Sequence, residues 1–245
     1  MGESKKLEIT IDFVAVRNLT AREHRQTRAE IAEWGPIRAY QLSQQRHDER
    51  LAAAPDASTL ACKTGCSWCC HFTVDVRPVE IFPILDFIES RFTPQEQERV
   101  RSEIAANSAV LQPLDEMERM QRNIKCPFLS DGRCTIYEVR PQTCRNYHAT
   151  NAAGCQKSFE EPGNLDIDPE FAPLVYQAGG AHVEAFSRAM QDAGYDVTAF
   201  ELNTALAVAM TQPAGVRQRF EARQPPFVGL QGVEVPPEFM EEEDG

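Results

Sequence analysis

Residues 61–71, "ACKTGCSWCCH", place four cysteines within nine residues, namely Cys62, Cys66, Cys69 and Cys70, directly before His71. Spacings of two or three residues let one backbone turn direct several thiolates at a common centre, and Gly65 permits a tight turn there. Adjacent Cys69 and Cys70 point in different directions, so we expect them to have different roles. The stretch predicts a metal centre built into an irregular loop.

The expected compartment also favours metal over disulfides. The N-terminal stretch "MGESKKLEITIDF" lacks the apolar core of a secretory signal, and no window approaches the roughly 20 apolar residues of a membrane span. We therefore expect a cytoplasmic protein without membrane contact, in which thiols stay reduced. The net charge of −12 disfavours a nucleic-acid partner.

The rest of the chain is typical of a mainly α protein with at most a few short strands. Helices are predicted over 21–54 with a break at Gly35-Pro36, and then from Pro78, from Pro94 after a Thr93 cap, from Pro169 after an Asp168 cap, from Thr198, and over 214–223. Alternation predicts a strand at 7–16, and "CTIYEV", residues 134–139, predicts a second one. The predicted architecture is an irregular cysteine-rich core wrapped by helices.

Four parts follow from this pattern. Residues 1–58 form an N-terminal strand and helical segment, 59–160 a cysteine-cluster metal-binding domain, 161–232 a helical part, and 233–245 an acidic tail.

Four further cysteines lie more than fifty residues after the first group: Cys126, Cys134, Cys144 and Cys155. Cys126 and Cys134 flank a turn with Asp131-Gly132 at its tip. Cys144 falls in the first turns of a helix that begins at Pro141, where thiolate charge is favoured. Five bases between Arg122 and His148 would offset a thiolate-rich centre, and His71 and His148 are candidates for extra ligands or for donors to them.

The segments "CKTGCSWCC" and "CPFLSDGRCTIYEVRPQTCRNY" occur together and in order, and over residues 60–155 the chain resembles the YkgJ-type cysteine-cluster (CxxCxxCC) family, a zinc- or iron-chelating domain. The resemblance implies that the first seven cysteines are metal ligands and that Cys155 is a less fixed, late one. Flagellin lysine N-methylases are the members with a named activity, and the resemblance does not carry that activity to this shorter chain.

The identity of the metal stays open at this point. Eight thiols allow two four-thiolate zinc sites, or one 4Fe–4S cluster with four further cysteines. A single C-x2-C spacing, followed by gaps of seven, nine and ten residues, is unlike a zinc ribbon and favours iron–sulfur. "CKTGCSWC" also resembles the cluster motif of radical S-adenosylmethionine enzymes, but the helical downstream sequence does not match their βα barrel.

These observations predict an iron–sulfur protein that acts in redox transfer or as an enzyme on an unknown substrate. A structural zinc module or a metal trafficking or sensing protein is the alternative. A lysine N-methylase-like enzyme or a radical S-adenosylmethionine enzyme is a minor alternative. The sequence does not decide whether the protein is an enzyme, and it indicates an unidentified protein or small-molecule partner.

Overall fold

Ten α-helices make up most of the described chain, which comprises residues 12–167 and 169–233 of the computed structural model. The mainly helical fold class is therefore confirmed. The helices are α1 Phe13–Trp34, α2 Pro36–Ala53, α3 Pro78–Arg91, α4 Pro94–Leu111, α5 Glu116–Met120, α6 Gln142–Asn146, α7 Ala152–Glu160, α8 Pro173–Asp192, α9 Leu202–Thr211 and α10 Pro213–Glu221. Short 3-10 helices are η1 Ala57–Thr59, η2 Trp68–His71 and η3 Tyr137–Val139, and the strands are β1 Asp75–Val76, β2 Leu129–Ser130, β3 Arg133–Cys134 and β4 Phe200–Glu201.

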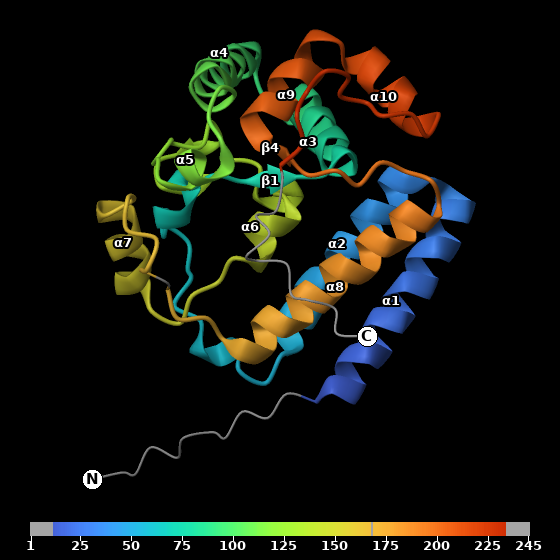
Figure 1. Cartoon of the computed structure of the whole chain (residues 1–245), viewed down its shortest axis with the longest axis vertical. Coiled ribbons are helices and arrows are strands. Elements are labelled where there is room, and N and C mark those ends of the chain that lie inside the picture. Colours follow the sequence, from blue (N-terminus) through green and yellow to red (C-terminus); the bar gives the residue numbers. More distant parts are fainter. Residues whose placement is uncertain (1–11, 168, 234–245) are drawn as a thin grey trace.

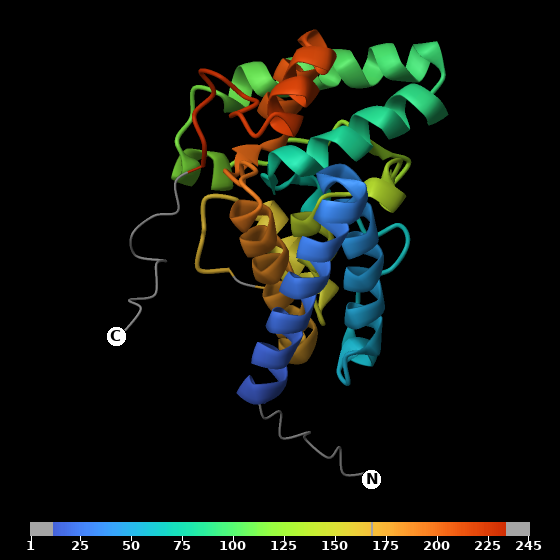
Figure 2. The same cartoon turned by 90° about the vertical axis from the view of Figure 1, so that its right-hand side faces the viewer.

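The helices form two groups (Figure 1). The long helices α1, α2 and α8 make a bundle on one side, while α3, α4, α9 and α10 gather on the other. Figure 2 shows the second group crossing over one end of this bundle. Helix α6, which carries Cys144, lies between the two groups of helices. Helix α7, which carries Cys155, lies at the outer edge of the molecule.

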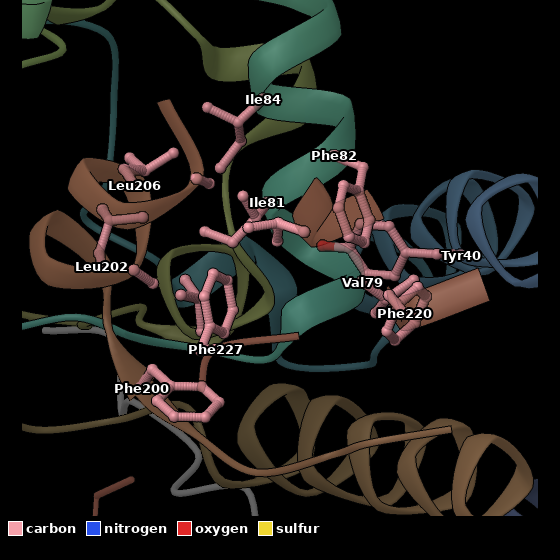
Figure 3. Packing of buried hydrophobic residues seen from close by; sticks show 14 of the residues in the cluster. Tyr40, Val79, Ile81, Phe82, Ile84, Phe200, Leu202, Leu206, Phe220 and Phe227 are labelled. Atoms are coloured by element: carbon pink, nitrogen blue, oxygen red, sulfur yellow. The ribbon is translucent and has the colours of Figure 1, made fainter. Parts of the chain in front are cut away.

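Helix α3 is the centre of the main core, because it is buried on nearly every face. Val79, Ile81, Phe82 and Ile84 are each at most 1% exposed. Figure 3 shows them against Tyr40 from the bundle and against Leu202, Leu206 and Phe220 from the second group. Truncating a buried aromatic such as Phe82 to alanine costs about 3–5 kcal/mol in comparable cores. This core draws on residues from all three described parts of the chain, and the proposed domain division stays a prediction.

Two small antiparallel sheets complete the described fold. Strand β1 pairs with β4 in the register Asp75↔Glu201, and β2 pairs with β3 in the register Leu129↔Cys134. The turn between β2 and β3 carries Asp131 and Gly132 at φ 49° and 72°, as its sequence predicts. No parallel sheet occurs in residues 12–167 or 169–233, so the βα series of a radical-enzyme barrel is missing there.

Several predicted elements are wrong at their starts. Residues 13–16 are helical and not a strand, because the Asp12 carboxylate accepts N–H bonds from Val14 and Ala15 and caps α1. The rest of that predicted strand lies outside the described residues. The predicted strand 134–139 pairs only at Cys134 and then turns into η3.

The last long helices also begin later than their sequences predict. Helix α8 starts at Pro173 and not at Pro169, and the predicted cap Asp168 lies outside the described residues. Helix α9 starts at Leu202, because Glu201 is held by β1 and itself caps the helix through Asn203 N and Thr204 N. Long-range strand pairing thus overrides the local capping pattern at Thr198.

Other boundaries follow the predicted signals. Gly35, at φ 80°, separates α1 from α2, and Thr93 with Glu96 forms a capping box at α4. Within the described residues, no helix combines the length and the apolar character that crossing a bilayer requires.

The α1–α2–α8 bundle has a polar interior that no pattern in its sequence predicts. Glu23 is fully buried and accepts hydrogen bonds from Thr27, Ser43 and Arg46, at 2.8–3.1 Å. Burial alone would raise the pKa of Glu23, but the hydrogen bond and charge of Arg46 hold it at about 2. The charge is therefore paired, as buried carboxylates require.

Two fully buried histidines, His47 and His182, stack in the same bundle with ring centroids 4.7 Å apart. Burial lowers the pKa of His47 to about 4 and that of His182 to about 3. Neither ring nitrogen of His47 has a hydrogen-bond partner within the described part of the chain. Both rings are therefore neutral in the folded protein at neutral pH.

This pair predicts acid lability. Between the unfolded histidine pKa of about 6.5 and the folded value of His47, the unfolded state binds more protons, so the free energy of unfolding falls as the pH falls. We expect His47→Phe to reduce that slope by up to one proton, about 1.4 kcal/mol per pH unit. Urea unfolding of the wild type and of His47→Phe between about pH 7.5 and pH 5 measures the difference between their pH slopes. A contribution from bound metal that the two proteins share cancels in this difference. Parallel pH curves would contradict the assignment.

Glu80 connects three elements through one buried carboxylate. Its Oε2 accepts hydrogen bonds from the Tyr40 hydroxyl in α2, at 3.1 Å, and from Gln142 N at the start of α6, at 2.8 Å. Its Oε1 accepts from Arg77 N, at 3.0 Å, which caps α3. Glu80 therefore sets the position of α6, which carries Cys144.

We expect Glu80→Ala to lower the free energy of unfolding by about 3 kcal/mol, because three donors, two of them in buried hydrogen bonds, lose a charged acceptor. The matched control is Glu98→Ala on the exposed face of α4, with an expected change within about 0.5 kcal/mol. Chemical denaturation measures both. Equal stability of the two variants would show that the Glu80 contacts are not needed.

Candidate metal centre

The first cysteine group lies in a loop that ends in η2. Backbone bonds Cys66 N to Lys63 O and Cys70 N to Ser67 O close two consecutive turns of this loop. Gly65 between them has φ 92°, a conformation that few residues other than glycine adopt. The loop thereby presents four thiols on a short, folded segment, as the spacing predicts.

Four thiols from separate segments come together beside the core. We call Cys70, Cys126, Cys134 and Cys144 the inner set. Cys126 N donates to Cys70 O at 2.8 Å, which joins the first cysteine loop to the segment that leads into β2. Leu129 N in turn bonds Cys126 O, and Leu129 is the register partner of Cys134.

Helix α6 brings the fourth inner thiol. Thr143 Oγ1 donates to Asp75 O at 2.9 Å, and Gln142 N is held by Glu80, so Cys144 lies between β1 and α3. Cys126 and Cys134 pack against the main hydrophobic core. The inner set is thus held by backbone contacts on the core side of the region.

Every pair within the inner set interacts electrostatically. Burial, followed by the charges of Cys126, Cys134 and Cys70, raises the pKa of Cys144 well above its usual value. Burial and then Cys134 and Cys70 raise the pKa of Cys126 to about 12, and burial and Cys70 raise that of Cys134. At neutral pH these three thiols therefore lose their protons only where a cation offsets the charge, as metal binding does.

A second group lies on the outer side of the same region. We call Cys62, Cys66 and Cys155 the outer set. Ala149 N donates to Cys62 Sγ at 3.4 Å, and Ala61 N bonds Ala149 O at 2.8 Å, which ties this end of the loop to the chain just before α7. Burial, then the charges of Cys62 and Cys66, raise the pKa of Cys155 to about 11.

Helix α7 positions Cys155 against the loop. Phe159, one turn further along α7, packs on Trp68 and His71 of η2 with ring centroids 5.2 and 4.8 Å apart. Residues four apart share one helix face, so Cys155 faces the same loop. Cys155 is 5% exposed. The family resemblance implied that Cys155 is less fixed than the other cysteines. In the structure, helix α7 holds it against the loop.

Cys69 lies between the two groups. Its S–H donates a hydrogen bond to Cys70 Sγ, which raises the pKa of Cys69 and lowers that of Cys70 to about 7. Cys69 also interacts electrostatically with Cys144 of the inner set and Cys62 of the outer set.

The chemistry of these donors fits a thiolate-bound metal, although the coordination shell is not closed. None of the eight thiols forms a disulfide. The N–H groups of Phe128 and Ile136 donate to the sulfurs of Cys126 and Cys134, as donors around metal-bound sulfur do. Across the described residues, no three His, Cys, Asp or Glu side chains already surround one point.

Two of the arginines that were predicted to offset thiolate charge lie beside the segment that carries Cys134 and Cys144. The Arg145 guanidinium is 2% exposed, pairs with Asp48 and bonds the Glu138 and Arg140 carbonyls, so it braces the η3–α6 connection. Arg140 stacks on Tyr137 at 3.7 Å and, with Arg145, lowers the pKa of Cys134 against its burial. The predicted charge offset by arginines thus acts on at least one thiol.

The two candidate histidines differ. His71 Nδ1 lies 3.2 Å from Ser67 O, and its ring packs on Phe159. Burial lowers the pKa of His148, and its buried Nδ1 has no hydrogen-bond partner in the part of the chain described. The ligand roles of the histidines and of all eight cysteines stay predictions.

Sequence reasoning missed Glu80 and Asp75. Glu80 could have been found, because it lies two residues after Pro78, at the third position of the helix, where a carboxylate can cap it. Burial, then Glu116, raise the pKa of Asp75 to about 7. Nearby, a pocket of about 570 Å³ is lined by α5, Glu201 and residues 229–232. No sequence pattern marks this pocket, because its walls come from three distant segments.

These environments predict an order of thiol reactivity in the reduced, metal-free protein. Cys62 is exposed and Cys70 has a pKa of about 7, so we expect alkylation at neutral pH to modify these two first. Cys126 and Cys144 should react much later than these two, because burial raises their pKa values. Timed alkylation followed by peptide mass spectrometry gives the order. Early labelling of Cys144 would contradict the described packing of α6.

Comparison with known proteins agrees with this geometry. No curated protein and no solved structure matches the chain. A family model, CxxCxxCC, described as "Putative zinc- or iron-chelating domain", matches residues 61–164. The match spans all eight cysteines, from the loop before η2 to the end of α7. Residues 61–164, less than half of the chain, are therefore similar to the CxxCxxCC domains.

Proposed function

We propose that this protein is an iron–sulfur protein whose inner set holds a 4Fe–4S cluster and that it acts in electron transfer. The observation that carries the proposal is the mutual interaction of all four inner thiols, which come from four separate segments. Such a set supplies the four cysteines that a 4Fe–4S cluster takes. The wide, irregular spacing of these cysteines also favours a cluster over zinc knuckles.

The surroundings of the inner set suit a redox centre. A bound cluster would supply one-electron chemistry, whose potential depends on burial and on hydrogen bonds to sulfur. The N–H groups of Phe128 and Ile136 donate to the inner sulfurs. Arg140 and Arg145 add positive charge near Cys134, which offsets the negative charge of thiolate ligands.

The test is the metal content of protein purified without oxygen. We expect a coloured protein with about four irons and four sulfides per chain, the composition of one such cluster. Cys144→Ser should abolish the colour, while Ser158→Ala, on α7, should retain it. A colourless wild-type protein with stoichiometric zinc would overturn the proposal and favour a structural zinc module.

A second candidate, an enzyme, is favoured by the charged pocket. Asp115, Glu116, Arg119 and Glu201 line it, and Asp75 connects it to α6 through the Thr143 hydroxyl. A substrate there would lie on the side of β1 that faces α5. If the protein is an enzyme, Glu116→Gln should weaken substrate turnover without changing the metal content, and loss of metal on this substitution would argue against a separate substrate pocket.

A further inference from the structure

The pocket beside α5 has walls from three distant segments, and each wall is held in place. The walls are the α4–α5 turn with α5, the start of α9, and residues 229–232. The last wall is fixed at both ends, because Phe227 packs on Phe200 in the core and Val233 N donates to Ala199 O at 2.8 Å. Figure 1 shows α5 beside β1 and β4 at this place. The volume of about 570 Å³ is in the range of small-molecule sites.

The β1–β4 pair directs two carboxylates toward this pocket. Asp75 and Glu201 are register partners, so their side chains lie on the same face of the two strands. The opposite face carries Val76 and Phe200, which are buried in the core. Because Glu201 lines the pocket, Asp75 lies on the pocket side next to it.

These two carboxylates have very different partners. Glu201 accepts four hydrogen bonds from Asn203 and Thr204, at 2.7–2.9 Å. Asp75 is half-buried, and its carboxylate has no hydrogen bond or ion pair with any residue that the structure describes. Burial, and then the charge of Glu116, raise the pKa of Asp75 to about 7. Carboxylates directly opposite each other on paired strands repel, so this arrangement carries uncompensated negative charge.

The protein supplies little positive charge to the pocket. Its described lining residues include three acids, Asp115, Glu116 and Glu201, and one base, Arg119. Arg119 already pairs with Glu116 at 3.7 Å and donates to Asp115 O at 3.3 Å. A half-buried carboxylate left without a cation in such a cavity favours a cationic ligand and disfavours an anionic one.

We propose that this pocket binds a small organic cation, whose ammonium or guanidinium group lies between Asp75 and Glu116. The carbon chain of this ligand lies against the apolar lining side chains Leu114, Met117 and Leu230. A metal ion fits the pocket less well, because no three His, Cys, Asp or Glu side chains of the described chain surround one point. The inference rests on the second candidate function only in using the same pocket, and it concerns binding and not turnover.

The first experiment compares ligands of one size and different charge. Full-length wild-type protein is titrated calorimetrically at about pH 8 with putrescine and agmatine, and with butanediol and succinate as the neutral and anionic four-carbon controls. We expect a cation to bind and both controls to fail. Binding of neither cation, or equal binding of butanediol, would overturn the proposal. Capped lysine presents the same ammonium on a peptide, and its binding in place of both small cations would overturn the small-molecule assignment.

The second experiment removes the carboxylates one at a time. We expect Asp75→Asn and Glu116→Gln each to weaken binding of the cation about tenfold or more, because each removes a charged partner of the ligand. The matched control is Glu98→Gln on the exposed face of α4, which should keep the wild-type affinity. Thermal unfolding of each variant shows whether it is folded. Wild-type affinity in both folded pocket variants would place the ligand elsewhere.

The pH dependence of binding reports on Asp75 separately. Because the pKa of Asp75 is about 7, the carboxylate becomes ionised as the pH rises through that value, and a cation binds the ionised form better. We expect the affinity to rise between about pH 6 and pH 8 and Asp75→Asn to remove most of this rise. The other charged groups that act on Asp75 are Glu116 and Arg119 of α5, Glu201 of β4, and Arg77. An affinity that is independent of pH in the wild type would contradict the contact with Asp75.

Metal analysis of the same samples separates this inference from the proposed functions. Cation binding by a protein that holds no iron would overturn only the iron–sulfur proposal. An iron-containing protein that binds none of the cations would overturn only this inference. Cation binding without any turnover would support the binding site and argue against the enzyme.

Discussion

The buried carboxylate of Glu80 is the contact on which the rest of the cysteine region depends. It accepts hydrogen bonds from α2, from the start of α3 and from the start of α6. Because α3 is the centre of the core, the position of Cys144 follows from the packing of the whole molecule. The helical parts before and after residues 61–164 are therefore the support of the thiol region, and the bundle helix α2 reaches it directly.

The segments that carry the thiols are held in place by backbone hydrogen bonds. Hydrogen bonds such as Cys126 N to Cys70 O fix where each segment lies. The raised pKa values of Cys126, Cys134 and Cys144 mean that the free thiols stay protonated at neutral pH. A metal ion would have to displace these protons, so binding should weaken on acidification. Buried polar atoms without partners in the described residues gather on and near α6, at Gln142, Asn146 and His148, and such atoms commonly meet water or a ligand.

The α1–α2–α8 bundle makes a different use of buried charge. Glu23, Arg46 and Arg50 form paired charges inside it, and His47 and His182 stack beside them as neutral rings. Removing one partner of such a network leaves the other charge buried and unpaired, which costs more than the pair contributes.

The amino-acid sequence alone determined the helical class, most helix starts marked by proline or a capping residue, the cysteine loop and the hairpin around Asp131-Gly132. These features follow from local rules of backbone geometry, which act over a few residues. Tertiary structure decided the start of α9, because pairing of Glu201 with Asp75 acts across more than a hundred residues. It also decided which thiols interact with one another. Spacing gives the number of cysteines, but only tertiary contacts place Cys144 beside β1, through α6, and Cys155 against η2, through α7.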